Sequence, residues 1–423
     1  MRRSLAIVSP SFDLNGVVSP AVEDCPFCGL KSAFEVTWFF GGRHYTRKCK
    51  VCQKSKDFDL PSLSKKVIYL DQFVLSDMMK EIDPSRAGKP ARPNGGFFLE
   101  LGKKLHRLTK LQLIVCPRSR IHANESIVDH DDGDKIREVH ERLSFGTKFD
   151  HHESIYAQQV RDGLEAWLQG KDTFEMNADP SRVIGSAAKD WTGWFRVGVN
   201  RPASEEEADE LRASKRRLEA GLNRVRARWR QEPGENFDAW FEDEAAAHGD
   251  ASIIDYVQAA NAIRVGTPTP NSFPNNSFRL ISDVLFRLDA AGIQSAEQLA
   301  KAREFFASSI FRQIPVVRIV SAMWAGLAHC FRNRQTENPS AFNDIAAIST
   351  YLPFCDAMFL DKECASLLTS NPVMAKVAHK AQIFSLQTKD DFLSYLKGIE
   401  SSAPDDHLEK VHAVYGKFWL RSF

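Results

Sequence analysis

The chain has 423 residues, of which 43% are hydrophobic and 26% charged, and its formal net charge is +1. This composition excludes a disordered or fibrous chain and allows two or three globular domains. The near-zero net charge excludes bulk electrostatic attraction to a partner, so a nucleic-acid site would need a local basic surface. No apolar run reaches the roughly 18 residues of a membrane span. The run Leu5–Val8 is too short for the core of a signal peptide, and a cytoplasmic protein is expected.

Two cysteine pairs with CxxC spacing flank a predicted hairpin near the N-terminus. The run 34–40 favours a strand, Gly41–Gly42 follows as a turn, and 43–48 returns as a second strand. Four thiolates at this spacing can close a tetrahedron around a structural Zn²⁺, which a domain with so small a core needs. These thiolates belong to Cys25, Cys28, Cys49 and Cys52. The pattern predicts a zinc ribbon, with a redox pair or disulfides as the alternatives.

Five basic residues are candidates for contacts with nucleic-acid phosphates. Arg43, Arg47 and Lys48 lie on the returning strand of the ribbon. Arg118 and Arg120 stand at the start of a later predicted helix. Because ribbons also serve as protein-docking or purely structural modules, a role in nucleic-acid binding is one of several alternatives for the ribbon.

The segment after the ribbon alternates between strands and helices. A β-rich run over 67–70 ends on Asp71, and a helix starts directly after it. An amphipathic helix over 97–111, a second apolar strand over 113–117 and a helix with Glu125 in its early turns follow. This order of strand, helix, strand and helix predicts a parallel sheet.

From about residue 150 to 310 the strand signals become rare and helical patterns dominate. We expect a helical insertion that forms a lid or a substrate platform, with its tryptophans in the core. One predicted helix in this region carries an arginine cluster: Arg216, Arg217, Arg224, Arg226, Arg228 and Arg230. The cluster is either a phosphate-binding stripe or a solvated helix face balanced by neighbouring acids such as Glu219.

The last third returns to the alternating pattern. After a helix through Trp324, Asp344 lies in the first turn of an amphipathic helix. A short buried strand over 357–360 then ends on Asp361. A last strand near Ile383 and a closing helix over 390–396 complete the expected sheet.

Four carboxylates stand at strand ends or in the first turns of the helices: Asp71, Glu125, Asp344 and Asp361. Because the carboxyl ends of parallel strands meet at one edge of a sheet, these side chains are expected to converge. Their mutual repulsion favours hard divalent cations, Mg²⁺ or Mn²⁺, which could support phosphodiester hydrolysis. Taken singly, each residue could instead be a helix cap or an ion-pair partner.

The segments around these carboxylates resemble the PIN domain of metal-dependent nucleases: Val67–Asp71, Cys116–Ser119 with Glu125, Asn343–Ala347 and Ala357–Asp361. The resemblance covers residues 65–145 and 310–400 and implies a three-layer α/β/α fold. It implies that Asp71, Asp344 and Asp361 bind the metal, with Glu125 completing the site. The Thr that precedes the last Asp in the family is absent here, so Asp356 or Glu363 could share the role of Asp361.

The sequence therefore predicts an α/β protein with a PIN-like domain, a helical insertion and an N-terminal zinc ribbon. The expected division is a ribbon over 1–60, the PIN-like domain over 61–150 and 311–423, and the insertion over 151–310. The expected activity is that of an Mg²⁺- or Mn²⁺-dependent endonuclease, with RNA favoured over DNA as its partner. A catalytically inactive nucleic-acid-binding or adaptor protein is the alternative. The sequence does not indicate an oligomeric state.

Overall fold

The structure is a computed structural model of the chain. It describes residues 22–39, 41–83, 95–128, 132–193, 204–231, 236–266, 276–331, 341–416 and 419. The side chains of Arg226, Arg228 and Arg230, part of the expected arginine cluster, lie outside the described set. Within these ranges no helix combines the length and apolarity that crossing a membrane would require.

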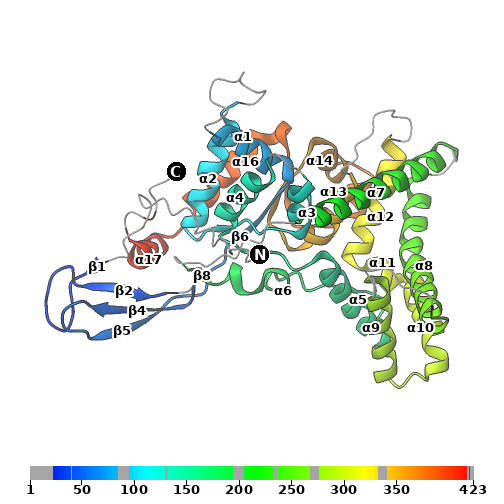
Figure 1. Cartoon of the computed structure of the whole chain (residues 1–423), viewed down its shortest axis with the longest axis horizontal. Coiled ribbons are helices and arrows are strands. Elements are labelled where there is room, and N and C mark those ends of the chain that lie inside the picture. Colours follow the sequence, from blue (N-terminus) through cyan, green and yellow to red (C-terminus); the bar gives the residue numbers. More distant parts are fainter. Residues whose placement is uncertain are drawn as a thin grey trace, which may run out of the picture.

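A four-stranded parallel sheet lies at the centre of the molecule (Figure 1). Its strands are β6 (Lys66–Leu70), β7 (Ile114–Val115), β9 (Ala357–Phe359) and β10 (Gln382–Phe384). The order is β10-β9-β6-β7, and all neighbours run parallel, so the predicted parallel sheet is confirmed. The connections leave β6 and β9 in opposite directions, which makes their shared carboxyl edge a topological switch point, where α/β sheets open a crevice.

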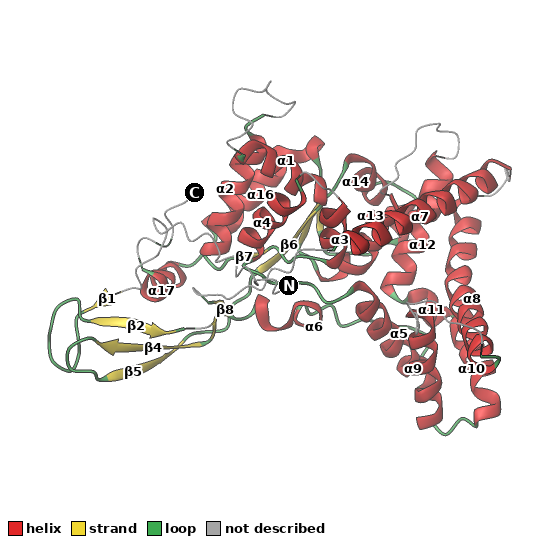
Figure 2. Cartoon of the chain, viewed as in Figure 1, coloured by secondary structure: helices red, strands yellow, loops and turns green. Residues whose placement is uncertain are grey.

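Helices cover both faces of this sheet (Figure 2). Alternate residues of β6 point to opposite sides: Ile68 and Leu70 belong to one apolar core, Val67 and Tyr69 to another. The first core is shared with α1 (Gln72–Ile82), α2 (Phe97–Lys110), α4 (Gly133–Ser144) and α16 (Lys389–Ser401). The second is shared with α12 (Pro315–Phe331), α13 (Ala341–Tyr351) and α14 (Lys362–Thr369). The short helices α3 (Arg120–Val128), α6 (Ser181–Ile184) and α15 (Val373–Lys376) complete this part.

The region from 152 to 313 is mainly helical, as expected, and extends away from the sheet (Figure 1). Its main helices are α5 (His152–Leu168), α7 (Glu205–Gln231), α8 (Phe237–Arg264), α9 (Asn276–Ala290), α10 (Ser295–Ala307) and α11 (Ser309–Gln313). An apolar core that includes Phe305 and Phe311 holds α5, α8, α9, α10 and α11 to α12. Trp191, Trp229 and Trp240 are buried, so the expectation of core tryptophans is confirmed for these three residues.

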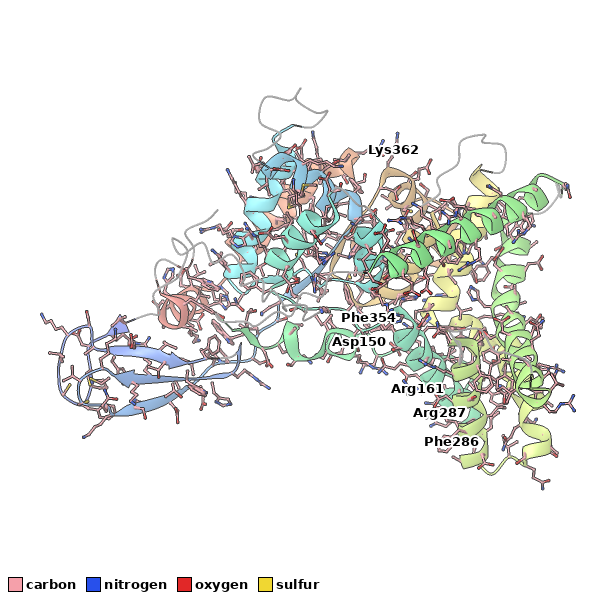
Figure 3. The ribbon with its side chains drawn as sticks, in the orientation of Figure 1. Asp150, Arg161, Phe286, Arg287, Phe354 and Lys362 are labelled. Atoms are coloured by element: carbon pink, nitrogen blue, oxygen red, sulfur yellow. The ribbon has the colours of Figure 1, made fainter. Side chains whose placement is uncertain are left out.

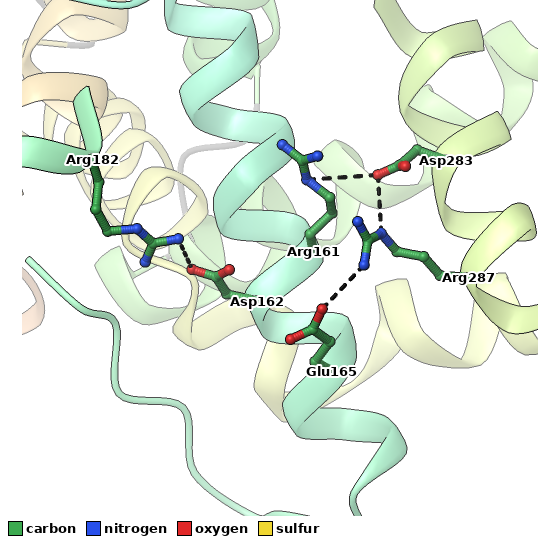
Figure 4. Close-up of polar contacts among 6 residues, drawn as sticks. All are labelled: Arg161, Asp162, Glu165, Arg182, Asp283 and Arg287. Carbon is green, nitrogen blue, oxygen red and sulfur yellow. Dashed lines mark hydrogen bonds and ion pairs between the residues drawn. The ribbon is translucent and has the colours of Figure 1, made fainter. Parts of the chain in front are cut away.

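Ion pairs join α5 to its neighbours on the outside of this region (Figure 4). Glu165 pairs with Arg287 at 3.1 Å, and Arg287 also pairs with Asp283 at 3.3 Å. Asp162 pairs with Arg182 on α6 at 2.7 Å. Because these charges are partly solvated, each pair contributes only about 0–1 kcal/mol, and the apolar core carries the stability of the region.

The ribbon lies at one end of the molecule as a four-stranded antiparallel sheet (Figure 1). Its strands are β1 (Val22–Glu23), β2 (Phe34–Trp38), β4 (His44–Cys49) and β5 (Ser55–Asp59). The predicted β2–β4 hairpin is confirmed, whereas β5 was not predicted because its residues are mostly polar and exposed. A separate pair, β3 (Gly41–Gly42) with β8 (Trp191–Thr192), ties the ribbon to the insertion. Gly41 has φ +103°, and a Cβ there would lie 3.0 Å from the Gly193 nitrogen.

Two expectations about this end of the molecule are wrong. The helix expected to close the chain, α16, is followed by α17 (Asp405–Tyr415), which packs Val414 and Tyr415 with Val36 of the ribbon. Arg47 is fully buried rather than exposed, and its guanidinium donates to the Ala413 carbonyl at 2.6 Å. Arg47 therefore joins the ribbon to α17 and has no surface to offer a nucleic acid.

Candidate metal-binding sites

Asp71 and Asp361 follow neighbouring strands of the sheet, and each caps the next helix. Asp71 Oδ1 accepts a hydrogen bond from the Gln72 N–H at 2.5 Å at the start of α1. Asp361 Oδ1 accepts from the N–H groups of Glu363 and Cys364 at 2.7 and 3.1 Å at the start of α14. These bonds fix both carboxylates at the carboxyl edge of β6 and β9. The helix-cap interpretation of both residues is thus correct and places them where a ligand site would form.

The two aspartates are also in direct contact with each other. The Asp361 N–H donates to Asp71 Oδ2 at 3.2 Å, and the Asp71 N–H donates to the Phe359 carbonyl at 3.0 Å. Asp361 Oδ2 is buried and has no hydrogen-bond partner among the described residues. A buried carboxylate oxygen without a partner is costly unless a cation neutralises it, so this atom is suited to a metal ligand.

Asp344 reaches the same place from the first turn of α13. Carboxylate oxygens of Asp344 and Asp361 and the sulfur of Cys364 all lie within 4.8 Å of one another. Cys364 is buried, and no pattern in the sequence had placed its sulfur beside the carboxylates. Burial and the neighbouring Asp361 and Asp344 carboxylates raise the pKa of the Cys364 thiol well above its usual range. A neutral thiol is a poor ligand for hard cations, so the oxygen atoms define this site.

Glu125, on the second turn of α3, completes the group. Asn343 Nδ2 donates to Glu125 Oε1 at 3.0 Å, so the residue next to Asp344 orients this carboxylate. Burial raises the pKa of Glu125, while the Asn343 hydrogen bond and the charge of Lys215 oppose the rise. Lys215 belongs to α7 of the insertion, and no local sequence pattern had associated it with the carboxylates.

All four predicted carboxylates line a single pocket of about 930 Å³. Asp71, Asp344 and Asp361 therefore lie on one face of the sheet edge, close to Glu125. The other described polar residues of the lining are Gln72, Ser76, Asn124, His152, Glu153, Ser214, Lys215, Asn343, Lys362 and Glu363. The sequence had not associated His152 and Glu153 with this pocket.

The pKa of Asp71 reports how crowded the pocket is with negative charge. Burial first, then the Asp361 and Glu125 carboxylates, raise this pKa from 3.8 to about 7. The folded protein therefore holds this proton more tightly than the unfolded chain, and the free energy of unfolding falls as the pH rises from about 4 to about 7. A shift of about three units bounds the effect at about 4 kcal/mol.

We expect Asp71→Asn to remove this pH dependence in the metal-free protein. The variant should gain stability relative to the wild type as the pH rises through that window, because its amide has no charge to desolvate. Thermal unfolding with a chelator, followed from about pH 4 to about pH 8, measures this difference. Any constant cost of the amide cancels in the comparison. Parallel stability profiles for the two proteins would contradict the crowded-pocket interpretation.

Of the two residues that could share the role of Asp361, Glu363 lines the pocket, whereas Asp356 and the five basic candidates lie outside its lining. Asp356 sits at the opposite, amino end of β9, where its carboxylate accepts from the Val67 N–H at 2.8 Å, so it cannot share the role of Asp361. Arg118 is ion-paired with Glu141, whereas Arg120 is exposed. On the ribbon, Arg43 pairs with Asp190 at 3.3 Å and Lys48 is exposed.

The ribbon carries a second candidate metal site, made of Cys25, Cys28, Cys49 and Cys52. The Cys25 and Cys52 sulfurs are 3.7 Å apart, and those of Cys28 and Cys49 are 3.8 Å apart. Four thiolates about 2.3 Å from one zinc ion have sulfurs about 3.8 Å apart, so the group could hold zinc. All four cysteines are free, which rules out disulfides among them in this structure.

No protein-family model, curated protein or solved structure matches this chain.

Proposed function

We propose that the protein is a divalent-metal-dependent nuclease with a PIN-like catalytic domain, acting as an endoribonuclease. The observation that carries the proposal is the meeting of Asp71, Asp361, Asp344 and Glu125 in one pocket at the sheet's switch point. The unpartnered Asp361 oxygen and the raised pKa of Asp71 both indicate a site that needs positive charge. The preference for RNA rests on the resemblance to the PIN family alone.

The residues present fit a hard divalent cation. Asp71, Asp344 and Asp361 offer carboxylate oxygens, the donors that Mg²⁺ and Mn²⁺ prefer, and they would hold the ion. When bound, the ion would polarise a phosphate oxygen and lower the pKa of a water molecule. Bound positive charge would also keep Asp71 ionised at neutral pH, in contrast to its raised pKa in the metal-free pocket.

The remaining residues supply orientation and charge. Glu125, whose pKa burial raises, is suited to take a proton from the attacking water. Asn343 fixes its carboxylate at 3.0 Å. Lys215, which also lines the pocket, offers a positive charge to a phosphate there.

We expect Asn343→Ala to lower kcat by about 10- to 100-fold, because Glu125 would lose the group that orients it. Asn124→Ala is the matched control, because it removes a side-chain amide from the lining of the same pocket, whereas the amide that donates to Glu125 is that of Asn343. Steady-state cleavage of a labelled single-stranded RNA measures both variants. Equal losses in the two variants, or no loss in either, would reject the orienting role of Asn343.

One assay tests the proposal as a whole. Labelled single-stranded RNA and single-stranded DNA are incubated with the protein and Mn²⁺ or a chelator, beside the Asp71→Asn and Asp344→Asn variants. Metal-dependent cleavage that both substitutions abolish supports the proposed nuclease activity. The comparison of the two substrates shows whether RNA or DNA is cleaved. Binding without cleavage in every lane would favour a nucleic-acid-binding adaptor with a PIN-like fold.

A further inference from the structure

A second hollow opens beside the carboxylate pocket, along α7. It has a volume of about 400 Å³ and shares Leu218 and Phe342 with the lining of the pocket, so the two hollows are adjacent. Its described lining comes from α7, α8, α12 and α13: Arg217, Leu218, Gly221, Leu222, Arg224, Val225, Glu244, Trp324 and Phe342. From Leu211 to Val225, α7 follows both hollows over about 21 Å at 1.5 Å per residue.

Three basic side chains lie along this stretch of α7. Lys215 lines the carboxylate pocket and its charge lowers the pKa of Glu125, while Arg217 and Arg224 line the second hollow about half a turn and about two and a half turns further along α7. All three side chains are exposed. Glu244 is the one carboxylate among the described residues of the second hollow. The charge along α7 therefore changes from negative at the strand ends to positive away from them, which complements a chain of phosphates leading out of the metal site.

One exposed aromatic side chain, that of Phe342, lines both hollows. Phe342 is 41% exposed and immediately precedes Asn343 and Asp344 on α13. Its ring packs against that of Trp324, and the two ring centroids are 5.9 Å apart. A supported, solvent-facing ring offers a surface on which an unpaired base can stack, whereas the bases of a duplex are already stacked on one another.

We infer that α7 and Phe342 form the binding path for the single-stranded part of a polynucleotide next to the bond that is cleaved. Arg217 and Arg224 contact its phosphates, and Phe342 stacks on a base near the metal site. This inference rests on the proposed nuclease function and adds to it the form of the substrate, its direction out of the pocket and a role for the insertion.

Binding is tested without catalysis, in chelator, with the full-length protein. The probes are a fluorescein-labelled oligouridylate and a labelled duplex of the same length, followed by fluorescence anisotropy. The wild type should bind the single strand more tightly than the duplex. Phe342→Ala should weaken single-strand binding by about tenfold. The double variant Arg217→Ala with Arg224→Ala should lower the slope of log affinity against log salt by about 1.4, as expected for two lost phosphate contacts.

Matched controls remove equivalent groups elsewhere. Phe286 on α9 is 71% exposed and lies well away from Lys362, which lines the carboxylate pocket (Figure 3). Phe286→Ala should bind as the wild type does, and so should the double variant Arg264→Ala with Arg303→Ala, whose side chains are exposed on α8 and α10. Circular dichroism verifies that each variant is folded.

The results separate this inference from the proposed function. Hydrolysis of bis(p-nitrophenyl) phosphate by the wild type with Mn²⁺ reports the metal site alone, since this small ester does not extend along α7. If the ester is hydrolysed but Phe342→Ala and the α7 double variant bind RNA like their controls, the proposed binding path is rejected and the proposed nuclease function is supported. Preferred binding of the duplex, or no binding of either probe, also overturns the path. If the ester is not hydrolysed but those variants lose RNA binding, the proposed binding path is supported and the proposed nuclease function is rejected.

Discussion

Asp344→Asn is expected to lower cleavage of single-stranded RNA by about 10³-fold in the presence of Mn²⁺. A bound divalent cation supplies several kcal/mol of transition-state stabilisation, and about 4 kcal/mol corresponds to that loss in rate. Asp344 suits the experiment because it is only partly buried and stands in the first turn of α13. Asparagine keeps its size and removes the charge, so the fold should survive.

The loss should appear in metal binding as well as in rate. Titration with Mn²⁺, followed by calorimetry, should show weaker binding to the Asp344→Asn variant. Asp391→Asn is the matched control, because Asp391 also lies in the first turn of a helix, α16, but is outside the carboxylate pocket. It should bind Mn²⁺ and cleave RNA like the wild type. Wild-type cleavage by Asp344→Asn would remove this mechanism.

The place of the carboxylates could be predicted because it depends on local patterns. The apolar runs that become β6 and β9 each end on an aspartate, and parallel strands bring their carboxyl ends to one edge. No knowledge of the insertion is needed for that step. The predicted meeting of Asp71, Asp344 and Asp361 therefore follows from the order of the elements, and the structure places all three in one pocket.

The contribution of the insertion could not be predicted in the same way. The helical pattern of 205–231 indicates which face of α7 is apolar but not which surface that face covers. Lys215 reaches the pocket only because α7 packs beside α3, a contact between segments about 90 residues apart in sequence. Arg47 shows the reverse case: a basic residue on a strand was expected at the surface, and α17, near the other end of the chain, buries it.

The two interpretations of the capping residues turned out to be compatible. Asp71 and Asp361 use one oxygen each to cap a helix, which is the local role that their sequence context suggests. Asp361 keeps its second oxygen buried and without a partner among the described residues. A residue can thus satisfy a local structural pattern and still present a ligand atom, so the local pattern alone could not decide between the two roles.

Cys49→Ser is expected to abolish zinc binding and to unfold the outer part of the ribbon. Among the described residues, Cys25, Ala33 and Phe34 are buried around Cys49, and Cys52 and Phe58 are partly buried against them, which is too little to hold four strands together. Zinc bound by structural sites of this kind contributes about 10–16 kcal/mol in isolated zinc-finger peptides. The N–H groups of Cys52 and Val51 and the neighbouring thiols outweigh the effect of burial and lower the pKa of Cys49 to about 6, which favours the thiolate that zinc needs.

Zinc content by elemental analysis and the rate of limited proteolysis within 22–60 measure these effects. The wild type should hold one zinc ion per chain, and Cys49→Ser should lose it and be cut rapidly near Cys25 and Cys52. Cys116→Ser is the matched control, because Cys116 is equally buried but lies in the core of the parallel sheet, and it should keep its zinc. A Cys49→Ser protein with full zinc content and wild-type resistance would contradict the site.

The extent of the unfolding is informative in itself. The inner end of the ribbon does not depend on zinc alone, since Val36 and Phe39 pack with Tyr415 of α17 in a separate apolar core. Unfolding in Cys49→Ser should therefore stop at this core, and the carboxylate pocket, which lies beyond it, should still bind Mn²⁺. Loss of both metals from the single substitution would mean that the ribbon and the α/β domain fold as one cooperative unit, so that the ribbon supports the pocket as well as its own strands.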